Sequence, residues 1–392
     1  MASKAAGCDS DRGERSRLLV VSPGGLGKQY HGPAISIYRL LSRLEDRLHV
    51  DVLHGSVEQD DMAPLKGRAI RTGTATSHFQ GSFSYLIGAS WFMFRHHRDY
   101  DVVLLASLNL LTLIPGVIAH MLGIRVVARA AAIAEVSTQT GGSLGSALKL
   151  ALMRRVSVYL AISGRIKAGL EEVAGGEGSV HHIPNGVDTA RFAPVDHGRA
   201  AQLTQELELK PAPLLRLICV GAMGNRKGQH ILVEAMSLLP EGVALLLVGP
   251  YREQGYRQEI TNLISKKGLE GRVDHIEFMH DVEKAYGTGA VYLLPSAGEG
   301  MPNGMLEAMA CGLVPIGTRV SGIEDLIQPG CGRFVERDAR SIADAVQAYI
   351  RDPEKLAKER NRARSRIEAA YSSALVSERF FHLLTKGINN SL

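Results

Sequence analysis

Short apolar runs alternate with longer amphipathic stretches along most of the chain. The runs end at glycine, proline or polar residues, whereas the stretches between them repeat apolar residues at helical spacing. Short apolar runs bounded by turn residues predict buried strands, and the periodic stretches predict helices. The strands predicted in the first half are Leu18–Ser22, Val50–Leu53, Val102–Ala106, Arg125–Ala128 and Val158–Ile162, and a helix is predicted over Ile35–Leu44.

The second half repeats this order of strands and helices. Strand, helix and strand in succession predict a parallel sheet covered by helices on both faces. We therefore expect an α/β protein with two Rossmann-like halves, each with its own sheet. The strands predicted here are Leu215–Val220, Val243–Val248, Val273–Phe278, Val291–Leu294 and Val314–Gly317, and the helices are Gln229–Leu239, Pro302–Ala310 and the C-terminal stretch Asp352–Leu384.

The length of 392 residues suits two domains. Residues 1–16 are predicted to form a loose polar tail, 17–190 the first domain, 191–370 the second, and 371–392 a C-terminal helix that packs back on the first domain. The break falls near Ile183–Asp188, where proline, asparagine and glycine are adjacent. Because ligands of such sheets bind beyond the carboxyl ends of the strands, the cleft between the domains is the expected active site.

Composition favours a cytoplasmic protein that does not span the membrane. The four cysteines lack metal-binding spacing, and the first residues lack the apolar core of a signal peptide. The uncharged stretch Val102–Ala119 is long enough for a spanning helix, but its Ser107, Asn109 and Pro115 favour a strand, a turn and a helix. The net charge of +5 is modest, and we expect no nucleic-acid partner.

The segment Pro295–Glu307 carries the clearest chemistry. A predicted strand ends at Pro295, a glycine-containing loop follows, and Pro302 is placed for the first turn of the next helix. A helix N-terminus binds phosphate, and carboxylates on either side of it accept hydrogen bonds from sugar hydroxyls. The alternative is a helix with one capping glutamate and one surface glutamate. The candidate donor-binding residues are Glu299, Gly300, Met301, Asn303, Gly304 and Glu307.

Glu299, Glu307 and the following Ala308–Gly312 closely resemble the signature of glycosyltransferase family 4, the retaining group 1 glycosyltransferases. The resemblance covers most of the chain and implies the GT-B architecture, in which two Rossmann-like domains face each other across a cleft. It also implies that Glu299 contacts the donor sugar, that the intervening amides bind the diphosphate, and that Glu307 contacts the ribose.

Two further segments fit the same family. Val180–Pro194 is similar to its interdomain segment, and Val220–Gly228 resembles the glycine loop of its second domain. The resemblance implies that Lys227, with help from Arg226, binds the donor phosphates. A cation is needed there because the departing nucleoside diphosphate gains negative charge in the transition state. The alternative for Lys227 is an exposed lysine in a turn.

The loop Pro23–Gly32 resembles the glycine loop of the family's first domain, where small residues let the backbone approach the donor diphosphate or the acceptor. Gly25 and Gly27 are candidate donor-binding residues, and Lys28 and His31 are acceptor-side candidates. A plain strand-to-helix turn is the alternative, because the full dinucleotide-binding spacing of glycines is absent.

Three positions depart from the family pattern. Ala222 stands where an arginine is usual, so Arg226 is expected to replace it. Many members carry a histidine near the reacting carbon, but the corresponding region here has none, which makes Arg129 and Glu135 the acceptor-side candidates. Met279–Asp281 stands where glycine is common, beside the expected nucleobase pocket.

The segment Trp91–Arg98 places aromatic rings beside cations. That mixture suits a membrane surface, with rings among the headgroups and cations on the phosphates. It suits the end of a core helix equally well. Peripheral contact with the inner face of the membrane would fit a lipid-linked acceptor.

The sequence thus predicts a retaining glycosyltransferase of the hexosyltransferase class, which moves a sugar from a nucleoside diphosphate sugar to a hydroxyl of a glycan or lipid-linked acceptor. UDP-sugars are the favoured donors and GDP-sugars the second choice. Glu299 and Lys227 are the expected catalytic residues, and neither a metal nor another cofactor is required. The expected context is bacterial polysaccharide, lipopolysaccharide or glycolipid assembly. The alternatives are a sugar-nucleotide epimerase or phosphorylase on the same fold, and a non-catalytic donor-binding subunit.

Overall fold

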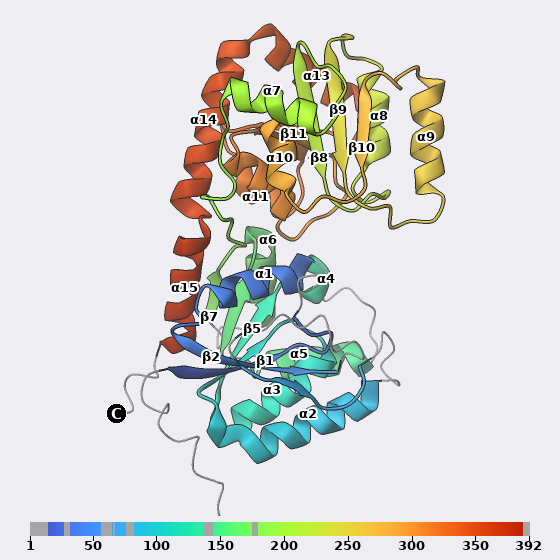
Figure 1. The fold of residues 1–392 in the computed structure, drawn as a ribbon. Helices are drawn as coiled ribbons and strands as arrows, with labels where there is room; N and C mark the ends of the chain where they lie inside the picture. The colour runs from blue at the N-terminus through green and yellow to red at the C-terminus, as the bar shows by residue number, and fades with distance from the viewer. Residues whose placement is uncertain are drawn as a thin grey trace, which may run out of the picture. The chain divides into compact units, whose positions relative to one another are not determined.

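The chain forms two compact units, each built on its own parallel sheet (Figure 1). The computed structural model describes residues 15–26, 32–55, 65, 67–75, 82–136, 144–174 and 179–386. The first unit runs to Gly186 and resumes at Ala374, and the second spans Val187–Ser373. The two crossings of the chain between the units therefore fall between residues 186 and 187 and between residues 373 and 374. The boundaries expected from the sequence were 190/191 and 370/371.

The sheet of the first unit has seven strands among the described residues, in the order β3-β2-β1-β4-β5-β6-β7. Leu18 of β1 is the register partner of Val50 in β2 and of Val102 in β4, and all three are buried. The strands are β1 (Ser16–Val21), β2 (Leu48–His54), β3 (Ala69–Arg71), β4 (Val102–Leu105), β5 (Arg125–Ala130), β6 (Val158–Ala161) and β7 (Ser179–His182).

Helices cover both faces of this sheet. On one face, α1 and α15 share a core with β1, β2 and β4. On the other, α3 packs against β4 and is flanked by α2 and α5 (Figure 1). The helices are α1 (Gly32–Ser42), α2 (Phe83–His96) with the 3₁₀ turn η2 (His97–Asp99), α3 (Leu110–Met121), α4 (Ile133–Val136), α5 (Leu144–Met153), α6 (Gly164–Ala174) and α15 (Ser373–Thr385).

The sheet of the second unit has six described strands in the order β10-β9-β8-β11-β12-β13. They are β8 (Leu215–Val220), β9 (Val243–Val248), β10 (Val273–Ile276), β11 (Val291–Leu294), β12 (Val314–Thr318) and β13 (Arg333–Val335). Its helices are α7 (His197–Glu206), α8 (Gln229–Met236), α9 (Tyr256–Lys266), α10 (Val282–Gly287), α11 (Asn303–Ala310), α12 (Ile323–Leu326), α13 (Ala339–Arg351) and α14 (Pro353–Ala370).

Both sheets confirm the predicted α/β class with two Rossmann-like halves. In each sheet the chain builds outward from the first strand to one edge and then returns to that strand's other side. The direction of winding therefore reverses between β1 and β4 in the first unit, and between β8 and β11 in the second. Such a reversal leaves a crevice beyond the carboxyl ends of the two strands, where ligands of open α/β sheets bind.

The uncharged stretch Val102–Ala119 forms a strand, a loop and a helix, as its polar residues predict. It comprises β4 and most of α3, and Asn109 caps α3 through a hydrogen bond from the Thr112 amide to Oδ1. Within the described ranges, no helix has the length and apolarity needed to cross a membrane.

The predicted helical stretch Asp352–Leu384 is interrupted, and the interruption has a physical cause. The chain leaves α14 at Tyr371, whose carbonyl accepts a hydrogen bond from the Val187 amide at 2.9 Å. The Ser373 amide donates in turn to the Val187 carbonyl at 2.8 Å. This pairing replaces helical hydrogen bonds where the chain returns to the first unit, and α15 then places Phe380 and Leu384 in that unit's core.

Candidate functional site

The candidate site lies at the reversal of winding in the second sheet. The loop after β8 begins at Gly221, and the loop after β11 begins at Pro295. Gly221 and Gly249 both have backbone φ angles near +140°, and a Cβ on Gly249 would lie 2.2 Å from the Gly221 carbonyl oxygen. Only glycine fits this close approach, which brings the loops after β8 and β9 together.

Four side chains from the loops after β8 and β11 form what we call the Lys227–Glu299 cluster, comprising Arg226, Lys227, Ser296 and Glu299. Glu299 Oε1 accepts from Lys227 Nζ at 2.7 Å, from Ser296 Oγ at 2.7 Å and from an Arg226 guanidinium nitrogen at 3.1 Å. The side chains of Lys227 and Glu299 are 14% and 8% exposed, whereas that of Arg226 is 57% exposed. The cluster is thus a mostly buried ion pair with one exposed cation at its rim.

The cluster leaves one carboxylate oxygen of Glu299 for another partner. All three contacts reach Oε1, and no described residue bonds Oε2. A carboxylate held in this way accepts hydrogen bonds in a fixed direction. Beneath it, burial raises the pKa of the Cys219 thiol to about 12, so that thiol is neutral and the local charges are those of the cluster.

Helix α11 begins one residue later than predicted. Pro302 has an extended backbone and precedes the helix, which starts at Asn303. A proline ring fixes φ and removes an N–H, so the position before the first helical residue suits it as well as the first turn does. The N-terminus of α11 follows the loop that carries Glu299, and the positive end of its dipole favours an anion there.

Two glycines let α11 and its loop sit close to their neighbours. A Cβ on Gly304 would lie 2.6 Å from the Tyr292 hydroxyl oxygen, which donates to the Val220 carbonyl at 3.0 Å. A Cβ on Gly322 would lie 2.3 Å from the Gly300 carbonyl and 2.8 Å from the Met301 Cα. The loop before α11 is therefore enclosed by the ends of β8, β11 and β12.

Glu307 points into the structure rather than out to solvent. It is 6% exposed, and the buried Tyr286 hydroxyl donates to its Oε2 at 3.2 Å. Burial, with Glu307 as a further cause, raises the pKa of Tyr286 well above its ordinary value, so the phenol stays protonated and keeps donating. Glu307 is thus oriented by the fold, as a carboxylate that receives a ribose hydroxyl would need to be.

Residues absent from the sequence-based list hold the two loops together. The Ser296 hydroxyl donates to Glu299, and Thr318 donates to the Ser296 carbonyl. Arg337, just after β13, donates to the Pro295 carbonyl at 3.0 Å and also to the Asn225 carbonyl. A serine directly after a predicted strand is a usable signal, but nothing local in the sequence marks Arg337.

Of the candidate residues in the glycine loop of the first unit, only Gly25 is among the described residues. Gly25 adopts φ +83°, and its amide donates to the Ser22 carbonyl at 2.8 Å, closing the turn after β1. Gly27, Lys28 and His31 lie outside the described residues.

Arg129 is buried and Glu135 is half-buried, and their contacts stay within the first unit. Arg129 is 1% exposed and donates to Ser36 Oγ and Asn185 Oδ1, both at 2.8 Å. Burial lowers its pKa to about 10. Glu135 accepts from the Leu108 amide at 3.2 Å, and burial raises its pKa. These two side chains hold the ends of β4, β5 and the Pro184–Asn185 segment.

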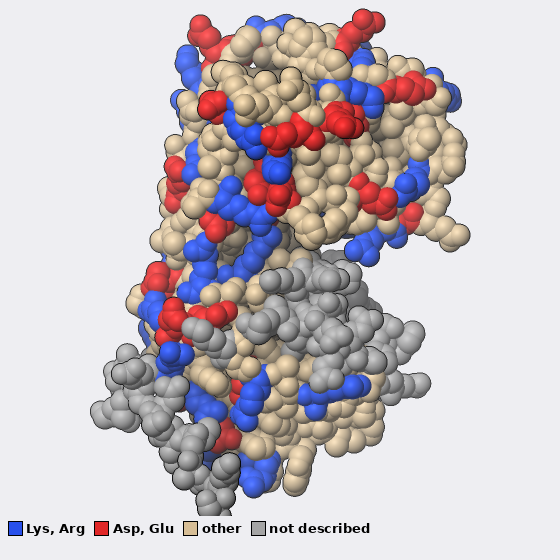
Figure 2. Space-filling model, in the orientation of Figure 1, with Lys and Arg blue, Asp and Glu red and all other residues tan. Residues whose placement is uncertain are grey.

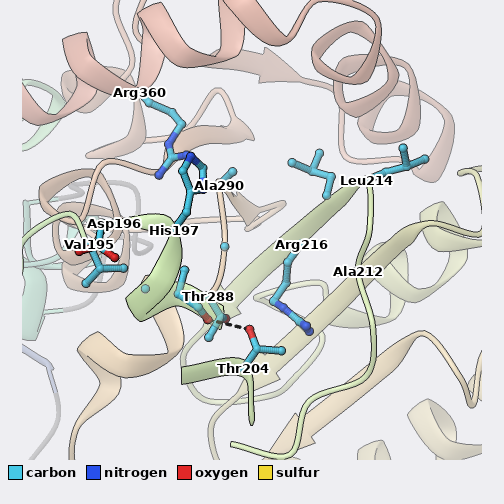
Figure 3. A pocket seen from close by; sticks show the side chains of 14 residues that line it. Val195, Asp196, His197, Thr204, Ala212, Leu214, Arg216, Thr288, Ala290 and Arg360 are labelled. Carbon is cyan, nitrogen blue, oxygen red and sulfur yellow. Dashed lines mark hydrogen bonds between the residues drawn. The ribbon is translucent and has the colours of Figure 1, made fainter. Parts of the chain in front are cut away.

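A cavity of about 430 Å³ opens at the amino ends of the strands of the second sheet, away from the candidate site (Figure 3). Arg216 at the start of β8 and Ala290 just before β11 line it, with Arg360 of α14 at another part of its wall. These are amino ends of strands, whereas Lys227 and Glu299 follow carboxyl ends. The cavity is therefore separate from the cluster. Among the described residues, no group of three or more His, Cys, Asp and Glu side chains is placed to hold a metal ion.

Two family models match the chain, one in each half. The model of Glycosyltransferase Family 4 matches residues 30–191, and that of Glycosyl transferases group 1 matches 215–352. The second match contains the whole Lys227–Glu299 cluster and α11. The chain belongs to glycosyltransferase family 4.

Two curated relatives are named for colanic acid biosynthesis and for lipopolysaccharide core biosynthesis. The chain is 29% identical over 59% of its length to the Escherichia coli glycosyltransferase WcaL, which is assigned to colanic acid biosynthesis. It is 28% identical over 53% of its length to the lipopolysaccharide core mannosyltransferase LpsB of Rhizobium meliloti. The matched regions span 57% and 59% of these relatives, less than two thirds of their length.

Solved structures show the GT-B fold of the family. Anabaena HepE, crystallised with UDP, superposes with a TM-score of 0.80 at 20% identity, covering 94% of this chain and 99% of that one. Sucrose-phosphate synthase from Thermosynechococcus elongatus gives a TM-score of 0.77 at 23% identity, covering 96% and 100%. The predicted GT-B class, with two Rossmann-like domains, is confirmed.

Proposed function

We propose that this family 4 member is a retaining glycosyltransferase that uses a nucleoside diphosphate sugar. The observation that carries the proposal is the contact of Lys227 Nζ with Glu299 Oε1, 2.7 Å apart at the reversal of winding in the second sheet. It joins a mostly buried cation to a mostly buried carboxylate in the loop that leads to the N-terminus of α11. A diphosphate sugar needs such groups for its phosphates and its hydroxyls.

In the proposed reaction, the bond between the anomeric carbon and the β-phosphate oxygen breaks, and the acceptor oxygen bonds that carbon on the same face. The proton of the acceptor hydroxyl passes to water, and the nucleoside diphosphate leaves with an additional negative charge. Lys227 and the positive end of α11 stabilise that charge without moving, because the cluster and the Gly304 contact already hold them in place.

Glu299 positions the sugar in this scheme. Its Oε1 is occupied by Lys227, Arg226 and Ser296, so Oε2 receives a sugar hydroxyl. Glu307, fixed by Tyr286, receives the ribose. Retention at the anomeric carbon rests on the family resemblance of these two glutamates and their spacing.

UDP-sugars are the proposed donors, with GDP-sugars as the second choice. HepE was crystallised with UDP-glucose, and it shares the fold over most of the chain. A Corynebacterium glutamicum relative, 25% identical over 58% of this chain, is named as a GDP-mannose-dependent mannosyltransferase of a phosphatidylinositol mannoside. Both names support a nucleoside diphosphate donor. We place the enzyme at the cytoplasmic face of the membrane, acting on a glycan or lipid-linked hydroxyl.

The decisive variant is Lys227→Ala, with Lys210→Ala as its matched control. Lys210 also pairs with a mostly buried carboxylate, with Nζ 3.0 Å from Asp274 Oδ1, but at the amino end of β10. We expect Lys227→Ala to lower kcat by about 100- to 1000-fold, the usual effect of removing one fixed electrostatic contact. Lys210→Ala should keep the rate within a few-fold. Equal rates for the two variants would overturn the assignment.

A donor screen comes before that comparison. The purified chain is heated with UDP-, GDP-, ADP- and dTDP-sugars, and the true donor raises the unfolding temperature because it binds only the folded state. Product configuration is then read by NMR from the anomeric coupling, and an inverted product contradicts retention. Donor incubated without acceptor tests the epimerase alternative, since an epimerase would isomerise the sugar.

A further inference from the structure

Helix α2 of the first unit is apolar on two opposite faces. Tyr85, Ala89 and Met93 are spaced by four residues and are buried against the unit. The opposite face carries exposed apolar side chains at the same helical spacing. A helix that is apolar all round is usually enclosed by protein or lipid. The exposed set is Phe83, Ile87, Trp91 and Phe94, each more than half exposed, with Trp91 at 65%.

The layer that carries this face has an unusual charge pattern. Helices α2, α3 and α5 contain no aspartate or glutamate at all. The acidic residues that follow α2 in the sequence, Asp99 and Asp101, contact His96 at 2.9 Å and the Arg17 amide at 2.8 Å. Figure 2 shows this edge of the first unit as mostly uncharged surface with some basic side chains.

Exposed arginines lie in or after the last turn of two helices of this layer in the sequence. Arg95 lies in the last turn of α2 and Arg98 in η2, while Arg154 and Arg155 follow α5 directly. All four are exposed, and none forms an ion pair with any described carboxylate. Rings and apolar side chains flanked by cations, without acidic residues, match the chemistry of an anionic lipid surface.

We propose that this surface docks on an anionic lipid bilayer. We define it as the α2 face: Phe83, Ile87, Trp91 and Phe94 with Arg95 and Arg98. The apolar side chains enter the headgroup region, and the guanidinium groups meet lipid phosphates. A second copy of the chain fits less well, because a symmetric contact through the same face would oppose arginine to arginine without acidic residues between them.

The proposal goes beyond sugar transfer and does not rest on it. Vesicle binding succeeds or fails whether or not the Lys227–Glu299 cluster transfers a sugar, so the two failures are distinguishable.

Trp91 makes the test direct, because it is the only tryptophan in the chain. The full chain is mixed with vesicles of phosphatidylcholine, or of phosphatidylcholine with phosphatidylglycerol. We expect its emission to move to shorter wavelength, and to be quenched by brominated acyl chains, only with the anionic vesicles. Added salt should reverse the shift, because salt screens the arginine–phosphate attraction.

Variants separate the contribution of the apolar side chains to vesicle binding from that of the arginines. Arg95→Gln with Arg98→Gln should weaken vesicle binding by about 25-fold, since each arginine near an anionic surface contributes about fivefold. Ile87→Ser with Phe94→Ser should weaken binding while leaving Trp91 as the reporter. The matched controls are Arg351→Gln and Leu238→Ser, which change an exposed arginine and an exposed leucine of the second unit and should bind like the parent.

Three outcomes overturn the proposal. The first is an unshifted Trp91 emission with anionic vesicles. The second is an equal shift with neutral and anionic vesicles, which would remove the role of the arginines. The third is a chain that sediments as a dimer without lipid and already shields Trp91 from acrylamide, because a second copy would then occupy the α2 face.

Discussion

Gly304→Ala tests the fit between α11 and the strands beneath it. The new Cβ would lie 2.6 Å from the Tyr292 hydroxyl oxygen and 3.1 Å from the Val220 carbonyl. Ordinary contact begins at 3.4 Å, so the hydroxyl and the helix must separate by about 0.8 Å. Tyr292 is buried in β11 and its hydroxyl holds Val220, so the helix N-terminus is the part that moves.

The size of the effect follows from two opposing contributions. Overfilling a packed interior costs about 1–3 kcal/mol, whereas alanine in place of glycine in a helix stabilises it by up to about 1 kcal/mol. We expect a net loss of about 1–2 kcal/mol, or about 2–8 °C in the unfolding temperature of the second unit. Transfer should suffer more, because misplacement of a reacting group by about 1 Å costs up to about 100-fold in rate.

The assay combines thermal unfolding with initial rates of sugar transfer. Gly298→Ala is the matched control, because a Cβ on Gly298 meets nothing within 4 Å, although it lies in the loop beside Glu299. We expect that control to stay within about 0.5 kcal/mol of the parent.

A second substitution tests whether the contact with the Tyr292 hydroxyl causes the loss of stability in Gly304→Ala. Tyr292→Phe removes the hydroxyl in question and alone costs about 1 kcal/mol through its lost hydrogen bond to Val220. Combined with Gly304→Ala, the loss should be smaller than the sum of the single losses by about 1–2 kcal/mol. Strict additivity, or a Gly304→Ala variant as stable and active as Gly298→Ala, would refute the packing argument.

Three further predictions concern the second unit. The thiols of Cys219 and Cys311, whose pKa values burial raises to about 12, should resist iodoacetamide until the protein unfolds, as mass spectrometry would show. Since unfolded thiols ionise near pH 9.0, stability should fall as pH rises from about 9 toward 12, because only the unfolded chain releases those protons. Arg364→Met should cost about 2–4 kcal/mol of unfolding free energy, because three backbone carbonyls lose a charged donor, whereas the exposed Arg351→Met should cost little. Equal unfolding temperatures for these two variants would contradict the role given to Arg364.

The strands that the sequence predicts best are the central ones. Strands β8, β9 and β11 coincide with their predicted runs, because strands buried on both faces of a parallel sheet are almost entirely apolar; Arg216 of β8 is the exception among the three. The strands without a prediction are β3, β7 and β13, and each lies at an edge of its sheet. Edge strands are short and partly exposed, so polar residues such as Arg71, His181 and Arg333 interrupt the apolar pattern.

The residues of the candidate site were also predicted only in part from the sequence. Lys227 and Glu299 were marked by residue type and family resemblance, and strand order brings them together, because β8 pairs with β11 despite their separation in the sequence. Arg337 escaped prediction because its partners, the carbonyls of Pro295 and Asn225, are defined only once β13 is in place. The contacts of Arg129 were equally hidden, since Ser36 and Asn185 lie in distant segments.

Arg364 explains how α11 is held from its other end. From α14, it donates to the carbonyl of Ala310 at the C-terminus of α11, and to those of Thr189 and Phe192, just after the chain enters the second unit. Its charge also lies at the negative end of the helix dipole. Helix α14 ends at the return crossing, where Tyr371 pairs with Val187. The helix proposed to bind the donor phosphates, and both crossings of the chain, are therefore parts of one hydrogen-bonded block. A substitution at Arg364 should reach the Lys227–Glu299 cluster by moving α11, without touching either residue.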